Sequence, residues 1–198
     1  MSNQISTPLR RVSILAIDRV FASTLMQAKD FFHLASLRYG KQQGLGLTPA
    51  FETRLVSPDG QSVRSFSDVI MPVDGGLENA DIIVLPAFWD DFDALCTRYP
   101  QVLPWLREQH ARGAVLCGEA TGVFWLAEAG LLDGKEATTY WRFFNAFSER
   151  FPKVQLNQDK HLTDADNLYC AGGTTSACDL YIYPVSYTHL RAHETDSY

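Results

Sequence analysis

The sequence predicts an α/β fold, a doubly wound and mostly parallel sheet with helices on both faces. Three observations support this. Short apolar segments alternate along the chain with longer segments whose apolar residues recur at helical spacing. The short segments are apolar throughout rather than at every second position, as in strands that are covered on both faces. A length of 198 residues, 46% of them hydrophobic, suits one domain with a sizeable core.

The amino-terminal part supplies the first strand–helix unit. Val12–Ile17 is a β-branched, apolar run and predicts a buried strand. Apolar residues at helical spacing predict a helix over Phe21–Tyr39, with Gly40 as its carboxyl-terminal stop. Phe51–Val56 alternates like a strand, and Ser57–Gly60 has the composition of a turn.

The middle of the chain repeats the alternation. Val63–Ile70 suggests a short hairpin-like excursion, and Asp81–Leu85 is a second apolar strand. Helices are expected at Asp90–Tyr99 and Pro104–Arg112, followed by a third buried strand at Gly113–Cys117.

The last part begins with a strongly periodic helix at Thr121–Leu132. Another helix is expected at Trp141–Arg150 and a short strand at Leu168–Cys170. A Gly172–Gly173 turn then leads into a final helix, with Thr174, Thr175 or Ser176 as its cap.

Composition excludes several classes of function. A net charge of −6 argues against nucleic-acid binding by this domain. No segment approaches the roughly 20 apolar residues of a membrane span, and no secretory signal is visible. The four cysteines form no CxxC, and the histidines are scattered. We therefore expect a cytoplasmic protein with no metal, no cofactor and no disulfide framework.

The junction Cys117–Gly122 is the strongest candidate for chemistry. A buried strand turns into a helix within a few residues there, as in a nucleophile elbow. Ligands in open α/β sheets bind beyond the carboxyl ends of strands, and the first turn of a helix offers free N–H groups.

The run ATGVFWLAEAGLLDGKEATTYW at Ala120–Trp141 resembles the ThiJ/PfpI-like, class I glutamine amidotransferase-like domain of GlxA-type AraC-family transcriptional regulators. Arg150–Pro152, Cys170–Thr175 and Asp179–Leu180 also match, so the resemblance covers about Arg11 to Pro184. It implies a flavodoxin-like, class I glutamine amidotransferase-like fold.

The departures from the family pattern lie in its covalent machinery. Ala120 stands where the superfamily has its nucleophilic cysteine, and Tyr140 stands where the pattern has histidine. The acidic residue that often follows the first strand aligns with Thr24. Alanine is no nucleophile and tyrosine is a poor base near neutral pH, so we expect no enzyme activity.

A pocket made by Thr24, Glu119, Ala120, Thr121 and Tyr140 is therefore expected to bind a small polar metabolite without converting it. Glu119 has two possible interpretations, as a carboxylate of the pocket or as a solvated carboxylate in a loop. Tyr140 is expected to be mainly a packing residue, with ligand contact as its secondary role. Cys117, three residues before Ala120, is expected to be a small buried hydrophobe rather than a displaced nucleophile.

The resemblance implies a ligand-sensing domain at 11–184, behind a flexible amino terminus at 1–10. An AraC-type helix-turn-helix domain would follow and supply DNA binding, and a homodimer is expected. The alternatives are a stand-alone ThiJ/PfpI-like cysteine hydrolase, amidase or glyoxalase-like enzyme, and a binding module without a DNA function.

The segment 185–198 departs from the rest of the chain. VSYTHLRAHET, from Val185 to Thr195, resembles the translated sequence of a sequencing-library adapter. We expect this tail to be non-native and the natural protein to continue beyond Pro184, so its histidines carry no functional weight.

Overall fold

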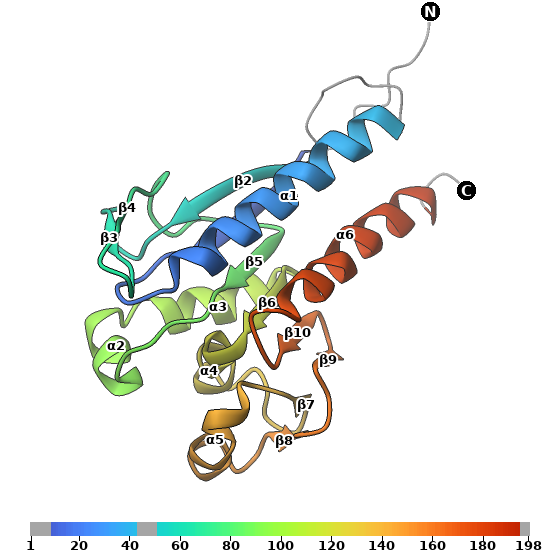
Figure 1. Ribbon diagram of the computed structural model, residues 1–198. Helices are drawn as coiled ribbons and strands as arrows, with labels where there is room; N and C mark the ends of the chain where they lie inside the picture. Colours follow the sequence, from blue (N-terminus) through green and yellow to red (C-terminus); the bar gives the residue numbers. More distant parts are fainter. Residues whose placement is uncertain (1–8, 43–50, 195–198) are drawn as a thin grey trace, which may run out of the picture.

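The computed structural model describes residues 9–42 and 51–194 and centres on a six-stranded sheet (Figure 1). Neighbouring strands run parallel, except that the edge strand β9 is antiparallel to β10. In spatial order the strands are β2 (Phe51–Val56), β1 (Arg10–Leu15), β5 (Ile82–Leu85), β6 (Val115–Glu119), β10 (Leu168–Ala171) and β9 (Leu162–Ala165). The doubly wound, mostly parallel sheet is therefore confirmed.

Helices cover both faces of the sheet. α1 (Ala22–Gln42) and α6 (Ala177–Glu194) lie side by side on one face (Figure 1). α3 (Val102–Ala111) and α4 (Val123–Glu128) pack against each other. The chain winds from β1 through α1 to one edge and from β5 through α3 towards the other, so right-handed crossovers place α1 and α3 on opposite faces.

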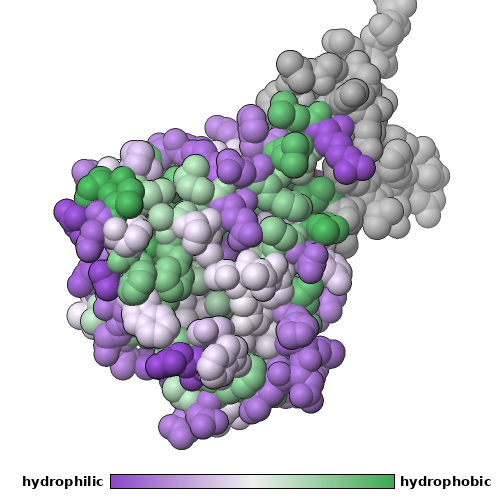
Figure 2. Space-filling view, viewed as in Figure 1, coloured by the Kyte–Doolittle hydropathy of each residue, from purple (hydrophilic) through white to green (hydrophobic). Residues whose placement is uncertain are grey.

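Four short strands and further helical turns complete the domain. β3 and β4 form an antiparallel pair, and the exposed side chains of Ile70 on β4 and of Val69 just before it give an apolar patch on the surface (Figure 2). β7 and β8 form a parallel pair. The bounds are β3 (Val63–Arg64), β4 (Ile70–Met71), α2 (Phe92–Arg98), η1 (Ala120–Gly122), β7 (Glu136–Ala137), η2 (Trp141–Phe143), α5 (Phe144–Arg150) and β8 (Gln155–Leu156).

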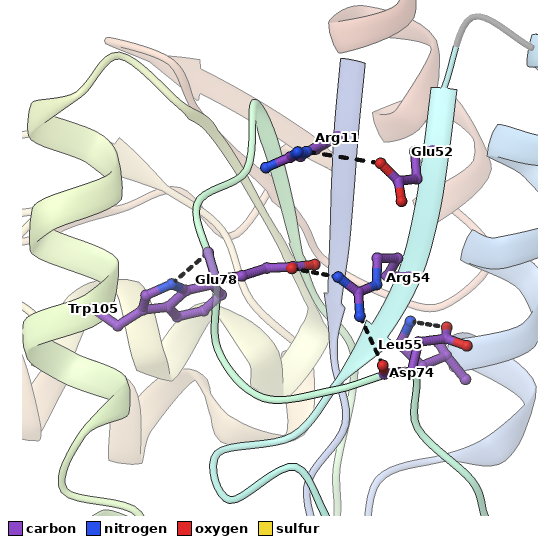
Figure 3. A network of polar contacts seen from close by, with 7 residues as sticks. All are labelled: Arg11, Glu52, Arg54, Leu55, Asp74, Glu78 and Trp105. Carbon is purple, nitrogen blue, oxygen red and sulfur yellow. Dashed lines mark hydrogen bonds and ion pairs between the residues drawn. The ribbon is translucent and has the colours of Figure 1, made fainter. Parts of the chain in front are cut away.

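A polar network holds the edge strand β2 to the segment before β5 (Figure 3). Arg54 on β2 forms an ion pair with Glu78, and its other terminal nitrogen donates to the carbonyl of Asp74 at 2.7 Å. The Asp74 carboxylate accepts from Leu55 N–H at 2.8 Å. On the other side of the sheet from α1, the Trp105 indole of α3 donates to the Glu78 carbonyl at 2.9 Å.

Some element boundaries differ from expectation. Helix α1 continues past Gly40, because a glycine inside a helix costs only about 1 kcal/mol and need not end it. The third strand runs Val115–Glu119 rather than Gly113–Cys117, so Glu119 belongs to the sheet. The helix expected at Thr121–Leu132 is a 3₁₀ turn followed by α4, which ends at Glu128.

Strand β9 was not anticipated from the sequence. It joins β10 through Asp166 and Asn167, whose φ angles are 56° and 61°. Two successive positive φ values are the signature of a type I′ hairpin turn, which favours such short polar residues.

The predicted domain limits of 11 and 184 stay a prediction. Strand β1 begins at Arg10, one residue before the expected start of the domain, and 1–8 lie outside the described residues. At the other end, the backbone of 185–194 continues helix α6, and 195–198 lie outside the description. The non-native origin of the tail stays a prediction.

Candidate functional site

The sharp strand-to-helix turn predicted at Ala120 is present. β6 ends at Glu119, which has an extended backbone, and the 3₁₀ turn η1 begins at the next residue. Ala120 has a φ of +50°, in the left-handed region that costs a residue with a Cβ about 1–2 kcal/mol. Such a conformation persists only where the surrounding structure over-determines it.

Close backbone packing is the first constraint on this turn. A Cβ at Gly122 would overlap the carbonyl oxygen of Leu85, so the turn lies directly against the end of β5. A Cβ at Gly118 would stand 3.0 Å from the Cα of Val123. Both glycines of the CGEATG motif therefore permit close approach, and neither has a positive φ.

Threonine hydroxyls supply the second constraint. Thr121 Oγ1 accepts from Phe88 N–H and donates to the Phe88 carbonyl, both at 2.8 Å. Thr139 Oγ1 donates to the Ala120 carbonyl at 2.7 Å. The predicted site residue Thr121 thus fastens the elbow to the segment after β5, and Thr139 fastens it to the segment that carries Tyr140.

Thr24 lies in the first turn of α1 and is 1% exposed. Its hydroxyl donates to the Phe21 carbonyl at 2.9 Å, and Phe21 N–H in turn donates to Ala87 at 2.9 Å. Ala87 immediately precedes Phe88, the partner of Thr121. The start of α1 therefore adjoins the same edge of the sheet, while the Thr24 hydroxyl is occupied within its own helix.

Glu119 is neither a loop residue nor solvated, so that interpretation of its carboxylate was wrong. Its side chain is completely buried, and Tyr181 of α6, also completely buried, donates a hydrogen bond to Oε1. Among the described residues, Oε2 has no hydrogen-bond partner. Burial raises the pKa of Glu119 well above its ordinary value, which favours the neutral acid.

Tyr140 is half-buried, at the start of η2, and belongs to a cluster of aromatic side chains. Its ring lies 5.5 Å from that of Trp141 and 6.2 Å from that of Phe143, measured between centroids. Phe143 contacts Trp89, and the guanidinium of Arg142 lies 5.8 Å from the centre of the Trp89 ring. This cluster was not predicted, although the high aromatic content of residues 140–144 is a signal that the sequence shows.

Cys117 occupies the core, as expected. It is completely buried on β6, and burial raises the pKa of its thiol well above the ordinary value. A thiolate is the reactive form of cysteine, so this side chain is poorly placed for nucleophilic attack. The elbow itself presents a methyl group at Ala120, which is 4% exposed.

The comparison with protein families decides the assignment. The family model described as the DJ-1/PfpI family matches residues 45–182. The chain belongs to the DJ-1/PfpI family. The family model covers the strained elbow, both threonine contacts and the Glu119–Tyr181 pair.

Curated relatives of this DJ-1/PfpI chain include transcriptional regulators. It is 33% identical over 142 residues to the HTH-type transcriptional regulator CdhR of Pseudomonas aeruginosa, covering 70% of this chain and 41% of that protein. It is 24% identical over 182 residues to the HTH-type transcriptional regulator GbdR of the same species, covering 91% of this chain and 47% of that protein. The chain thus spans less than half the length of these relatives. A match to isonitrile hydratase of Pseudomonas putida, 35% over 80 residues, covers 40% of this chain and 33% of the enzyme.

Solved structures agree on the fold. A putative transcriptional regulator from Vibrio parahaemolyticus superimposes with a TM-score of 0.78 at 21% identity, covering 95% of this chain and 99% of that one. An AraC-family transcriptional regulator from Pseudomonas putida superimposes with a TM-score of 0.74 at 20% identity, covering 91% of this chain and 92% of that one. These likenesses establish the α/β architecture.

Membrane-spanning helices and metal sites are two further features to consider. Within residues 9–42 and 51–194, no helix is both long and apolar enough to cross a membrane. The same residues contain no group of three histidine, cysteine or acidic side chains arranged to hold a metal ion. Around the elbow, the groups described above are backbone groups, Tyr140 and the neighbouring aromatic rings.

Proposed function

We propose that this chain is a non-catalytic, small-metabolite-sensing domain of a homodimeric bacterial transcriptional regulator. The observation that carries the proposal is Ala120, which keeps the strained backbone of the elbow but has no group that could attack a substrate. The similarity to HTH-type regulators supports the regulatory part. DNA binding would then belong to a separate helix-turn-helix domain, in agreement with the charge of −6 here.

The proposed ligand site lies at the carboxyl ends of β5 and β6. Ala120 and Thr121 form its floor, and Tyr140 with Trp89 and Trp141 forms an aromatic side, of which Trp141 is 65% exposed. Such rings give contact area to a small ligand at a low cost in conformational entropy. A polar metabolite would find backbone groups and the Tyr140 phenol for orientation.

The contact between Glu119 and Tyr181 offers a route by which ligand binding reaches helix α6. Glu119 directly precedes the elbow residue, and its carboxyl accepts a hydrogen bond from Tyr181, near the start of the helix that would lead to a following domain. A ligand that favours one arrangement of Ala120 would then also favour one position of Tyr181. Such coupling requires different ligand affinities for the two arrangements.

Calorimetric titration with a panel of free amino acids and small amines tests the sensing role. Saturable binding of at least one compound is expected, with Tyr140→Ala weakening it at least about tenfold. Tyr183→Ala is the matched control, because that half-exposed tyrosine lies on α6, where its ring contacts Tyr169 of β10. Equal binding by wild type and Tyr140→Ala would place the ligand elsewhere.

The enzyme alternative rests on the similarity to isonitrile hydratase and requires a reactive thiol. Iodoacetamide labelling under native conditions is expected to modify the half-buried Cys96 and Cys178 before the buried Cys117 and Cys170. No turnover of an isonitrile is expected. Turnover that disappears in Cys117→Ala would overturn the non-catalytic proposal.

A further inference from the structure

The amino ends of the sheet strands surround a concave site, at the opposite end of the strands from the elbow. A cavity of about 500 Å³ lies there, within the range of small-molecule sites. Its lining comes from the starts of β1 and β6 and from residues just before β5 and β10. The polar and charged side chains around it are Arg10, Arg11, Asn79, Asp81, Arg112 and Asn167.

The charge of this lining is positive, because its one carboxylate is already neutralised. Asp81 Oδ1 lies 3.4 Å from the Arg10 guanidinium, and Oδ2 accepts from Arg11 N–H at 2.8 Å. The lining has two further guanidinium groups, those of Arg11 and Arg112, and neither is paired with Asp81. The excess is local, in a chain whose overall charge is −6.

Both remaining guanidinium groups have free donors. Arg11 contacts Glu52 only through Nε, at 3.7 Å, and its terminal nitrogens point away from β2 (Figure 3). Among the described residues, the Arg112 side chain has no partner. Arginine forks match the oxygens of a carboxylate or a phosphate, so these two donors suit an anion.

A buried glutamine fixes a third donor in place. Gln109, 1% exposed, donates from Nε2 to Asn79 Oδ1 at 2.9 Å and accepts at Oε1 from Ala80 N–H at 3.1 Å. The oxygen of the Asn79 amide is thereby held by Gln109, which leaves the Nδ2 donor for the cavity. This orientation does not depend on a ligand.

We propose that this cavity is a binding site for an oxyanion-bearing small molecule, a carboxylate or a phosphate ester, held by Arg11, Arg112 and Asn79. The site goes beyond the proposed function, because it lies at the opposite end of the strands from the elbow. Its test does not depend on whether a metabolite binds at Ala120.

The experiment titrates the protein with inorganic phosphate and, separately, with succinate at constant ionic strength, followed by calorimetry. Saturable binding of at least one is expected. Stronger binding of phosphate points to a phosphorylated ligand, and stronger binding of succinate points to a carboxylate. Absence of saturable binding by both anions overturns the proposal.

Three variants show whether the cavity is the binding site. Asn79→Asp keeps the oxygen that Gln109 holds and replaces the donor with a negative oxygen, so it should abolish binding without disturbing the fold. Arg112→Gln should weaken binding at least about tenfold. Arg64→Gln, at an exposed arginine on β3 that lines neither proposed site, should leave it unchanged. Equal losses in Arg112→Gln and Arg64→Gln, or full binding by Asn79→Asp, would overturn the assignment.

Discussion

Tyr181 donates a hydrogen bond to Glu119, and both side chains are completely buried between β6 and α6. The carboxyl has no cationic partner among the described residues, so burial dominates its ionisation. This pair has consequences for stability that can be measured without knowing any ligand.

We expect the difference in unfolding free energy between wild type and Glu119→Gln to depend on pH. Because the pKa of Glu119 is raised in the folded state from its ordinary value of 4.5, the folded protein keeps a proton that the unfolded chain has lost above that pH. This stabilising effect is complete below pH 4.5 and decreases as the pH rises. Urea unfolding from pH 5 to 8 should show wild type losing up to about 1.4 kcal/mol per pH unit relative to Glu119→Gln. Parallel pH profiles would show that Glu119 is ionised in the folded state.

Replacing Ala120 with glycine should relieve the strain at the elbow. The left-handed conformation costs alanine about 1–2 kcal/mol, and the extra flexibility of unfolded glycine offsets about 0.5–1 kcal/mol of that gain. We expect Ala120→Gly to leave the free energy of unfolding unchanged or to raise it by up to about 1.5 kcal/mol.

Ala127→Gly is the matched control for this substitution. Ala127 is also 4% exposed but lies inside α4, where glycine should lower stability by about 1 kcal/mol. Equal destabilisation of both variants in denaturant unfolding would contradict a strained backbone at Ala120.

Gly122→Ala should destabilise the domain by more than about 3 kcal/mol, because the added methyl group would overlap the Leu85 carbonyl and β5 would have to move. Gly173→Ala is the comparison, since its nearest neighbour would be Ser176 Oγ at 4.0 Å. That variant should stay within about 1 kcal/mol of wild type in thermal or urea unfolding. A stable Gly122→Ala protein would contradict the close approach of η1 to β5.

The hydroxyl of Thr121 can be removed with little change of shape. Thr121→Val leaves both backbone groups of Phe88 without their partner, which should cost about 1–3 kcal/mol. Thr121→Ser keeps the hydroxyl and should cost less. Hydrogen exchange at the Phe88 amide provides a local readout, with faster exchange in Thr121→Val than in Thr121→Ser. Unchanged protection in the valine variant would contradict this contact.

The fold was predictable because its strongest signals are local. The runs 82–85 and 115–118 are apolar or small enough to be buried on both faces, and that pattern indicates a covered parallel sheet without knowledge of tertiary contacts. The turn at Ala120 was predictable from the same junction and from the family resemblance. Strand β9 was not, because Leu162–Ala165 includes the exposed Asp164 and is held by a two-residue turn.

The environment of the candidate site residues depended on tertiary contacts. Nothing in the sequence places Tyr181 against Glu119, which lie 62 positions apart, so the carboxylate could not be assigned to the core. Register mattered as well, because a strand ending at Cys117 would have left Glu119 in a loop. The aromatic cluster of Trp89, Tyr140 and Phe143 likewise forms only when two separate segments meet.

The two glycines and two threonines around Ala120 fix a backbone geometry that does not depend on the side chain at that position. Chemistry at the elbow is therefore separable from architecture. Replacement of one hydrogen of the Ala120 methyl group by a thiol, as in Ala120→Cys, would add a nucleophile to a turn that is already built. In this fold, a change between binding and covalent catalysis could begin with a single codon.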